Sequence, residues 1–277
     1  MERVTTKHDL TFYSFSGWAG VKQAIFTRHG GVSQAPFHSL NMGGTVGDDV
    51  AAVRQNHELM YDALDIDAAK TVTVWMVHGV DTVIANAPIY NRRWLAQADA
   101  IMTDKLDLTL VMRYADCTPI MAFDTVRGVI GIAHAGWQGT VNGMAGNLIK
   151  AMSQAYGSRP QDIFAGIGPS IGPKRYQVGE EVVAAVYNYF GVDKIWYTLP
   201  LPEERVKGLD LPLITRDPAD GTAYFNLWEA NRRDLLRTGV ERIEVMGLCT
   251  ATHTHDWFSH RAEKGKTGRF GAVISLV

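Results

Sequence analysis

The chain has 277 residues, of which 46% are hydrophobic and 20% are charged, and its formal net charge is −2. This balance is typical of a globular protein with a sizeable core, and it gives no basic surface for nucleic acid or an anionic membrane. Only Cys117 and Cys249 are present, so no disulfide framework is expected. The N-terminus lacks a signal-peptide pattern, and no apolar stretch approaches the ~20 residues that span a bilayer. We therefore expect a cytoplasmic protein whose partners include neither nucleic acid nor a membrane.

The N-terminal half is predicted to combine short strands with one long polar loop. Residues 11–27 predict a strand hairpin, and residues 28–49 predict a glycine-rich loop of a length that is usually functional or disordered. A helix should begin at Asp48 or Asp49, since acidic residues in a first turn favour the helix dipole. Short apolar runs then predict strands over residues 71–77, 80–85, 109–113, 119–123 and 128–133.

The C-terminal half is predicted to be richer in helices. Helices are expected over residues 140–156, 178–190 and 226–238, and strands within residues 163–173, 243–249 and 269–277. Residues 192–222 hold four prolines and predict an irregular surface excursion. Because strands occur both as hairpins and between helices, a mixed sheet with helices outside is expected. The even spacing of glycine and proline favours one compact domain over residues 1–277.

Three residues that can hold one metal ion stand at the ends of buried strand-like runs. His78 ends TVTVWMVH, Cys117 follows LTLVMRYAD, and His134 lies in GVIGIAHAG. Two imidazoles and a thiolate suit zinc or copper, and three protein ligands leave a position open for water or substrate, as in catalytic sites. The spacings match no local zinc-finger pattern, and a lone cysteine after a strand is often a small buried hydrophobe. Both interpretations stay open on these residues alone.

Two polar loops of the N-terminal half combine charged residues with candidate roles. TRHGG places Arg28 before two glycines and, with Asn41, offers donors to a phosphate or carboxylate; a solvated hairpin tip is the simpler interpretation. In RYADC, Arg113 and Asp116 flank Cys117. Asp116 is a candidate proton carrier or a partner that orients an imidazole, although aspartate often only caps a turn.

Two further loops lie in the second half of the chain. AHAGWQGT joins a strand to a helix that Thr140 is expected to cap, which would direct backbone N–H groups toward an anion. The segment THTHDWFSHRAEKGKTGRF contains a competing set of metal ligands, namely His253, His255 and His260. Its basic second half suggests an anion clamp over a site, or simply a solvated loop.

Several motifs occur in order along nearly the whole chain: HG at 78–79, ADAIMTD at 98–104, RYADCTPI at 113–120, GVIGIAHAGWQGT at 128–140, IGPSIGPKRYQVGEEV at 167–182, and GLCT with SHR and TGR near the end. Together they resemble the YfiH family, long called multicopper polyphenol oxidase or laccase domain proteins and now regarded as purine nucleoside phosphorylases. The resemblance implies a single-domain α+β sandwich of mixed sheets with helices outside. It also implies similarity to a toxin deamidase domain that uses a Cys–His pair.

The resemblance implies specific site residues. The metal ligands of the family fall on His78, Cys117 and His134, and its anion-handling positions on Arg28, Asn41, Arg261 and Arg269. The chain departs from the family pattern in three places. Gln138 replaces an arginine, Lys174 and Arg175 replace two cysteines, and His260 stands where a tyrosine is common. These departures bear on substrate preference more than on the metal.

The resemblance implies zinc-dependent phosphorolysis of purine nucleosides (adenosine, inosine and methylthioadenosine), with purine nucleosides and phosphate as partners, and deamination of adenosine. Deamination uses a metal-activated water and a carboxylate that moves protons, for which Asp116 and Asp99 are the candidates. One alternative is a hydrolase or deamidase with Cys117 as nucleophile. Copper-dependent oxidation of phenols is another, but one His₂Cys site cannot store the electrons that dioxygen reduction needs. A metal-stabilised binding protein would require a fourth protein ligand.

Overall fold

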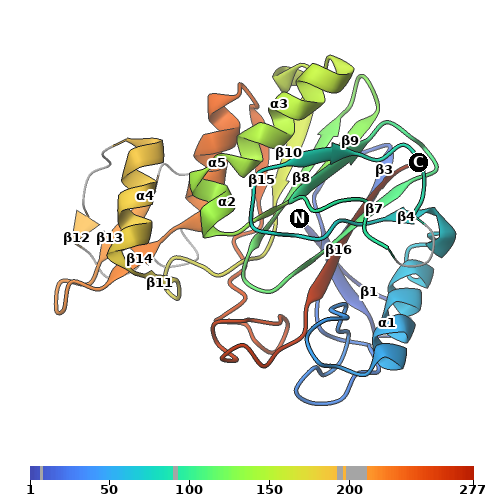
Figure 1. Ribbon diagram of the computed structural model, residues 1–277, viewed down its shortest axis with the longest axis horizontal. Helices are drawn as coiled ribbons and strands as arrows, with labels where there is room; N and C mark the ends of the chain where they lie inside the picture. Colours follow the sequence, from blue (N-terminus) through green and yellow to red (C-terminus); the bar gives the residue numbers. More distant parts are fainter. Residues whose placement is uncertain (7–8, 90–92, 192–195, 198–210) are drawn as a thin grey trace.

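Two mixed sheets, packed face to face, form the centre of the computed structural model (Figure 1), which describes residues 1–6, 9–89, 93–191, 196–197 and 211–277. The first sheet runs in the order β1 (Glu2–Thr5), β2 (Thr11–Ser14), β3 (Val21–Phe26), β16 (Phe270–Leu276), β7 (Thr109–Tyr114) and β4 (Thr71–Val72). The second runs in the order β15 (Arg242–Val245), β10 (Ile163–Ile167), β8 (Thr118–Asp124), β9 (Val129–Ala135), β6 (Ala100–Thr103) and β5 (Thr82–Ile84). Apolar side chains from both sheets form one buried cluster between them.

Helices cover the outer faces of both sheets. Helix α1 (Val50–Asp62) packs on the first sheet through Met60 and Tyr61. On the second sheet lie α2 (Trp137–Val141), α3 (Met144–Tyr156) and α5 (Leu227–Arg237). Strands β8 and β9 are buried along their whole length because the other sheet covers one face and helices the other. The predicted α+β sandwich with helices outside is thereby confirmed.

A smaller sheet and one more helix lie to the side of this sandwich. The sheet contains β11 (Gln177–Val178), β14 (Ala223–Phe225), β13 (Ile214–Arg216) and β12 (Trp196–Tyr197), and α4 (Glu180–Phe190) lies beside it (Figure 1). Two short 3₁₀ helices span Ala68–Lys70 and Pro160–Asp162. Part of the predicted excursion over residues 192–222 lies outside the described residues. No described helix has the length and apolarity needed to cross a bilayer.

The helix that was expected over residues 140–156 is two helices. Gly143 separates α2 from α3 with φ of 81°, and a Cβ atom there would collide with the Tyr189 hydroxyl. The expected cap was also wrong: Gly136 occupies the N-cap position of α2, while Thr140 lies inside this helix and accepts a hydrogen bond from Asn231 (3.2 Å). The helix begins four residues earlier than a Thr140 cap would allow.

The strands expected over residues 71–77 and 80–85 shorten to β4 and β5. Between them the chain crosses from the first sheet to the second, and the backbone at His78 has φ of 60°. A left-handed residue cannot continue a strand. Strands β1, β6, β11, β12, β13 and β14 were not predicted, and β12 and β13 lie within residues 192–222, which were expected to be irregular. Two predictions of the N-terminal half agree: α1 begins after Asp49, whose side chain accepts hydrogen bonds from Ala51 N and Ala52 N, and residues 11–27 form the β2–β3 hairpin.

Candidate functional site

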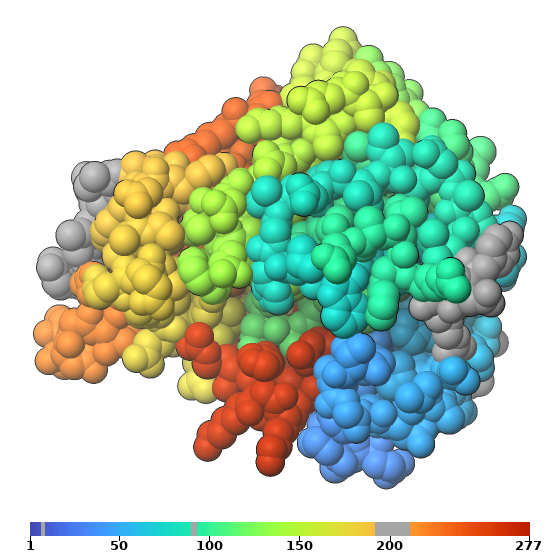
Figure 2. Space-filling view, viewed as in Figure 1, coloured from blue at the N-terminus to red at the C-terminus, as the bar shows by residue number. Residues whose placement is uncertain are grey.

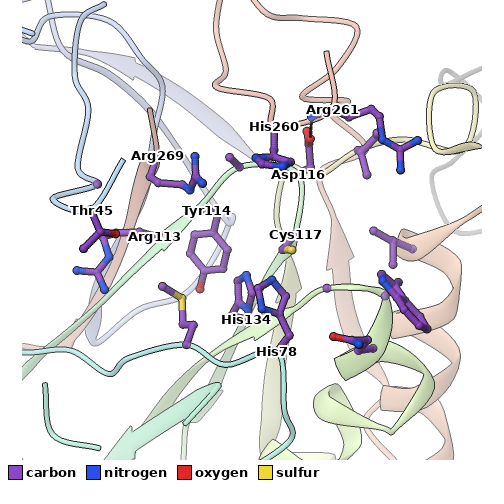
Figure 3. A pocket seen from close by; sticks show the side chains of 18 of the residues that line it. Thr45, His78, Arg113, Tyr114, Asp116, Cys117, His134, His260, Arg261 and Arg269 are labelled. Atoms are coloured by element: carbon purple, nitrogen blue, oxygen red, sulfur yellow. Dashed lines mark hydrogen bonds between the residues drawn. The ribbon is translucent and has the colours of Figure 1, made fainter. Parts of the chain in front are cut away.

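His78, Cys117 and His134 come together where the chain passes between the two large sheets (Figure 3). His78 lies in the connection from β4 to β5 and Cys117 in the connection from β7 to β8, and each connection crosses from the first sheet to the second. His134 is on β9. Their ligand atoms lie within 4.8 Å of one another, and no other three His, Cys, Asp or Glu residues in the described part of the chain form such a group.

The carboxylate of Asp99 holds the histidines of this group in place. This carboxylate is fully buried and accepts hydrogen bonds from the backbone N–H groups of Val77 (3.0 Å), His78 (3.0 Å) and Gly79 (2.7 Å). It also lies 2.9 Å from Nδ1 of His134. Burial alone would raise the pKa of Asp99, but the hydrogen bonds from His134 and Gly79 outweigh burial and lower it. The ionised carboxylate therefore fixes the backbone at His78 and leaves Nε2 of His134 free for a ligand.

The histidines around Cys117 favour ionisation of its thiol. Burial would raise its pKa, but the charge of His134 and hydrogen bonds from both histidines lower it to about 6. Burial likewise would lower the pKa of His134, whereas Cys117 and Asp99 raise it to about 9. Thiolate and imidazolium stabilise each other, and a metal cation would replace the proton that they share.

The donor set fits the metal that the sequence resemblance implies. A thiolate and two imidazoles are ligands that zinc and copper both accept. Three donors without a fourth from the described chain are typical of catalytic zinc sites, which keep one coordination position for water or substrate. The residues hold either metal by the same atoms, so the identity of the metal does not follow from them.

A pocket of about 570 Å³ opens over the three side chains. Figure 2 shows it as a hollow beside the C-terminal segment, drawn in red. Its size is typical of small-molecule sites. Trp137, Ile171, Tyr176 and Leu227 give it one apolar wall, and His260 borders it from the loop before β16. The pocket therefore offers an apolar surface for a planar ligand next to the candidate metal group.

Asp116 lines the pocket, whereas Asp99 does not. One oxygen of the Asp116 carboxylate accepts a hydrogen bond from the Thr250 hydroxyl (2.6 Å), and the other accepts from the backbone N–H of Arg261 (2.7 Å). The backbone at Asp116 is left-handed, with φ of 80°. Asp116 thus connects the Cys117 loop to the C-terminal loop. Asp99 instead contacts His134 and the backbone of His78 from outside the pocket.

The expected anion-binding residues separate into two groups. Arg261 and Arg269 line the pocket, and Arg28 and Asn41 do not. The Arg28 guanidinium pairs with Glu263 (3.0 Å) and lies over the Phe258 ring. Asn41 is fully buried, and its side-chain oxygen accepts from the backbone N–H of Arg269 (2.8 Å). In this structure Asn41 therefore holds the position of Arg269 and does not itself reach the pocket.

Arg113 was assigned no binding role from the sequence, but its side chain lines the pocket. The one available signal was a charged residue inside the apolar run TLVMRY of β7. Of the departures from the family pattern, Gln138 and His260 line the pocket, while Lys174 and Arg175 are exposed and do not. The charge lost at position 138 is therefore not returned by those two residues.

The C-terminal histidines do not form a second metal group in the described structure. His253 and His255 face each other with ring centroids 5.8 Å apart, and His255 pairs with Asp256 (3.2 Å). Asp256 also contacts His29, at 2.9 Å. Of the histidines at positions 253, 255 and 260, only His260 lines the pocket. The competing ligand set proposed for residues 253–260 is therefore not supported by this arrangement.

The sequence and the fold are both similar to those of known proteins. The family model described as multi-copper polyphenol oxidoreductase laccase matches residues 22–277. Over 267 residues the chain is 36% identical to a protein named purine nucleoside phosphorylase YlmD from Geobacillus stearothermophilus, covering 93% of this chain and 90% of that one. It is 41% identical over 253 residues to purine nucleoside phosphorylase ORF3 of Streptomyces griseus, covering 91% and 93%. The crystal structure of YfiH from Bacillus licheniformis matches with a TM-score of 0.82 and 32% identity, covering 99% of both chains.

Proposed function

We propose that this chain, which belongs to the multi-copper polyphenol oxidoreductase laccase family, is a zinc-dependent purine nucleoside phosphorylase acting at the pocket around Cys117. The observation that carries the proposal is the open group of three metal donors at the base of a pocket that also has an apolar wall and cationic side chains. The names of the relatives in Geobacillus and Streptomyces support the same reaction. We also propose that residues 1–277 form one catalytic domain, and that it works in the cytoplasm, where a free thiolate persists.

Phosphorolysis makes defined demands on the pocket. A phosphate oxygen forms a bond to C1′ of the ribose while the bond from C1′ to the purine nitrogen breaks. The bonding electrons leave with the purine, which takes up a proton. The pocket must therefore bind an anion, hold a planar base and keep both in line. Arg113 and Arg269 supply positive charge, and Trp137 and Tyr176 offer flat apolar surface to a purine.

The candidate metal group lies between these two surfaces. Zinc held by His78, Cys117 and His134 supplies Lewis-acid chemistry when bound. Asp99 keeps the two imidazoles in place, and Asp116 keeps the C-terminal loop over the pocket. Asp99 does not line the pocket, so its replacement should lower turnover without removing a direct contact to substrate.

Adenosine deamination is a second reaction that the pocket suits. Asp116 places a carboxylate at the pocket surface next to Cys117, and zinc nucleobase deaminases use a nearby carboxylate to transfer protons. Deamination would release ammonia and leave inosine, with no requirement for phosphate. Products therefore distinguish the two reactions on one sample.

The same residues could also serve a cysteine-nucleophile enzyme or a copper-dependent oxidase. The lowered pKa of Cys117 also suits a cysteine nucleophile with His134 as its base. Copper at the three donors would suggest phenol oxidation, but the described residues assemble only one such group, and dioxygen reduction draws on several copper centres. Metal analysis separates these possibilities before any assay.

The test uses purified protein whose metal content is measured on the same sample. The protein is incubated with adenosine, with and without phosphate, and adenine, ribose 1-phosphate and inosine are followed by chromatography. Phosphate-dependent release of adenine with about one zinc per chain is expected, and Cys117→Ala should lose both metal and activity. Cys249→Ala is the matched control, because Cys249 is buried outside the pocket and bonds Gly172. Full zinc and full turnover in Cys117→Ala would contradict the site assignment.

A further inference from the structure

Two arginine side chains share one face of the first sheet at the edge of the pocket. Arg113 on β7 pairs with Gly271 on β16. Arg269 precedes Gly271 by two residues, so the side chains of Arg113 and Arg269 project to the same side, as diagonal neighbours. The space beside Gly271 is filled by methionine side chains, since a Cβ atom there would lie 2.8 Å from Sδ of Met60. Figure 3 shows Arg113, Arg269 and Thr45 together on one side of the pocket, with Arg261 on the opposite side.

Neither guanidinium has a carboxylate partner within ion-pair distance among the described residues. Arg113 makes one long hydrogen bond, to the carbonyl of Val74 (3.3 Å). Arg269 bonds the carbonyls of Thr267 (3.2 Å) and Gly268 (2.8 Å). Carbonyl oxygens orient a guanidinium but do not neutralise its charge. Both side chains are partly buried, so water compensates their charges incompletely.

Other half-buried arginines of the chain differ in this respect. Arg28 pairs with Glu263 at 3.0 Å, and Arg232 and Arg233 both pair with Glu229 at 2.8 and 2.9 Å. Burial lowers the pKa of Arg113, and the charge of Arg269 lowers it further. Two like charges held together without a counterion are unfavourable unless an anion joins them.

The backbone holds this pair in place. The Asn41 side-chain oxygen accepts hydrogen bonds from the N–H groups of Gly43 and Arg269, both at 2.8 Å, and Met42 N donates to the carbonyl of Arg269 (2.8 Å). A Cβ atom at Gly43 would lie 2.8 Å from Cγ of Arg269. The loop at Gly43 therefore packs against the aliphatic part of the Arg269 side chain, and Thr45 lines the pocket beside it.

We propose that Arg113 and Arg269, with the loop Gly43–Thr45, form a binding seat for a phosphate group. A planar guanidinium donates two parallel N–H groups to an oxyanion, and two guanidiniums match the charge of a dianion. The phosphate is either free orthophosphate or the phosphate ester of a nucleotide. The use of this seat for the phosphate co-substrate rests on the proposed phosphorylase function. The binding of a phosphate group at the seat does not depend on that function.

Arg28 and Arg261 are not suited to this role in the observed conformation. Arg28 is neutralised by Glu263. Arg261 lies over the Tyr176 ring at 5.1 Å and donates to the carbonyl of Gln177 (2.8 Å). Its guanidinium points away from Cys117 in Figure 3. Arg261 therefore supports the apolar wall, while the seat lies on the other side of the metal group.

The first test measures binding of orthophosphate alone to the metal-loaded protein by calorimetry. Arg113→Gln and Arg269→Gln should each weaken binding by about tenfold or more, as expected for loss of charge-assisted hydrogen bonds. Arg113→Lys should recover part of the affinity, since charge returns without the planar fork. Arg54→Gln is the matched control, because Arg54 is exposed on α1 and does not line the pocket. Equal affinity for orthophosphate in wild type, Arg113→Gln and Arg269→Gln, together with equal affinity for adenosine 5′-monophosphate, would overturn the proposal.

A second arm identifies the source of the phosphate group. Adenosine 5′-monophosphate and adenosine are titrated into wild type and Arg113→Gln. If the monophosphate loses affinity in the variant while adenosine and orthophosphate do not, the seat holds a phosphate ester. If orthophosphate loses affinity, the seat holds free phosphate. If no phosphate compound depends on Arg113 or Arg269, the seat is refuted.

Kinetics separate this proposal from the phosphorylase function. The expected result in both glutamine variants is a raised KM for phosphate, with the KM for nucleoside within about twofold of wild type and unchanged zinc content. Turnover with an unchanged KM for phosphate would refute the seat as the site of the phosphate co-substrate and leave the phosphorylase function standing. Arginine-dependent binding of orthophosphate without any turnover of purine nucleosides would refute the function and leave the seat standing.

Discussion

Replacing Asp99 with asparagine keeps the shape of the side chain but removes the charge that organises the metal group. The carboxylate receives four N–H groups, two on each oxygen: His78 N and His134 Nδ1 on one, Val77 N and Gly79 N on the other. An asparagine offers one acceptor oxygen, so two of these donors would face its NH₂ group. A hydrogen bond to a charged group contributes about 1.5–3 kcal/mol, so the loss of two predicts a fall of roughly 3–6 kcal/mol in the free energy of unfolding.

The effect on the metal should be separable from the effect on stability. An acceptor that orients a ligating histidine contributes about 10- to 100-fold to metal affinity. Competition with a chromophoric chelator measures zinc affinity of Asp99→Asn, and urea unfolding of the metal-free protein measures stability. Asp81→Asn serves as control, because Asp81 is exposed and close in sequence. Zinc affinity within twofold of wild type and unfolding free energy within about 1 kcal/mol would refute the reasoning, since these are smaller than a single charged hydrogen bond.

Three further predictions concern the seat, the metal and the core. Gly43→Ala should raise the KM for phosphate several-fold with little change in the KM for nucleoside, because its Cβ would displace Arg269; steady-state kinetics check this. Zinc affinity, measured by chelator competition from pH 8 to pH 5, should fall most steeply below the Cys117 pKa of about 6, since protonation of the thiolate removes a ligand. Leu148→Ala should cost about 2–5 kcal/mol in urea unfolding, because this fully buried side chain packs on Gly131 of β9, while zinc content stays at the wild-type level.

The sequence was sufficient to predict features that depend on local pattern. Helix α1 was predicted to begin at Asp48 or Asp49 because acidic residues favour a first turn; Asp49 proves to be its N-cap, and the first turn itself holds no acidic residue. The grouping of His78, Cys117 and His134 followed from metal-binding residue types at the ends of apolar runs. In each case the signal lies within a few residues of the feature, and tertiary packing agrees with it.

Other features depend on partners far along the chain. The break between α2 and α3 is set by Tyr189 packing against Gly143, and TVNGM by itself is compatible with a continuous helix. Arg28 was expected to bind an anion, but its charge is neutralised by Glu263, which lies 235 residues away in the sequence. Arg113 becomes a candidate because no described residue gives it an acidic partner within ion-pair distance, and the absence of a partner has no sequence signature. Whether a charged side chain forms an internal ion pair or binds a ligand depends on its neighbours in space, and these are known only from the fold.

The geometry around His78 favours a metal site over a cysteine nucleophile. Cys117, His134 and Asp99 alone would make a nucleophile, a base and an orienting carboxylate, and the lowered pKa of Cys117 suits that use as well. In such a triad His78 would have no task. Yet three of the four hydrogen bonds to Asp99 come from the backbone of residues 77–79, and they hold His78 in a left-handed conformation that costs of order 1–3 kcal/mol. A buried carboxylate that stabilises this strained turn brings a second imidazole beside the thiolate, and the chemistry that uses both imidazoles and the thiolate together is metal binding.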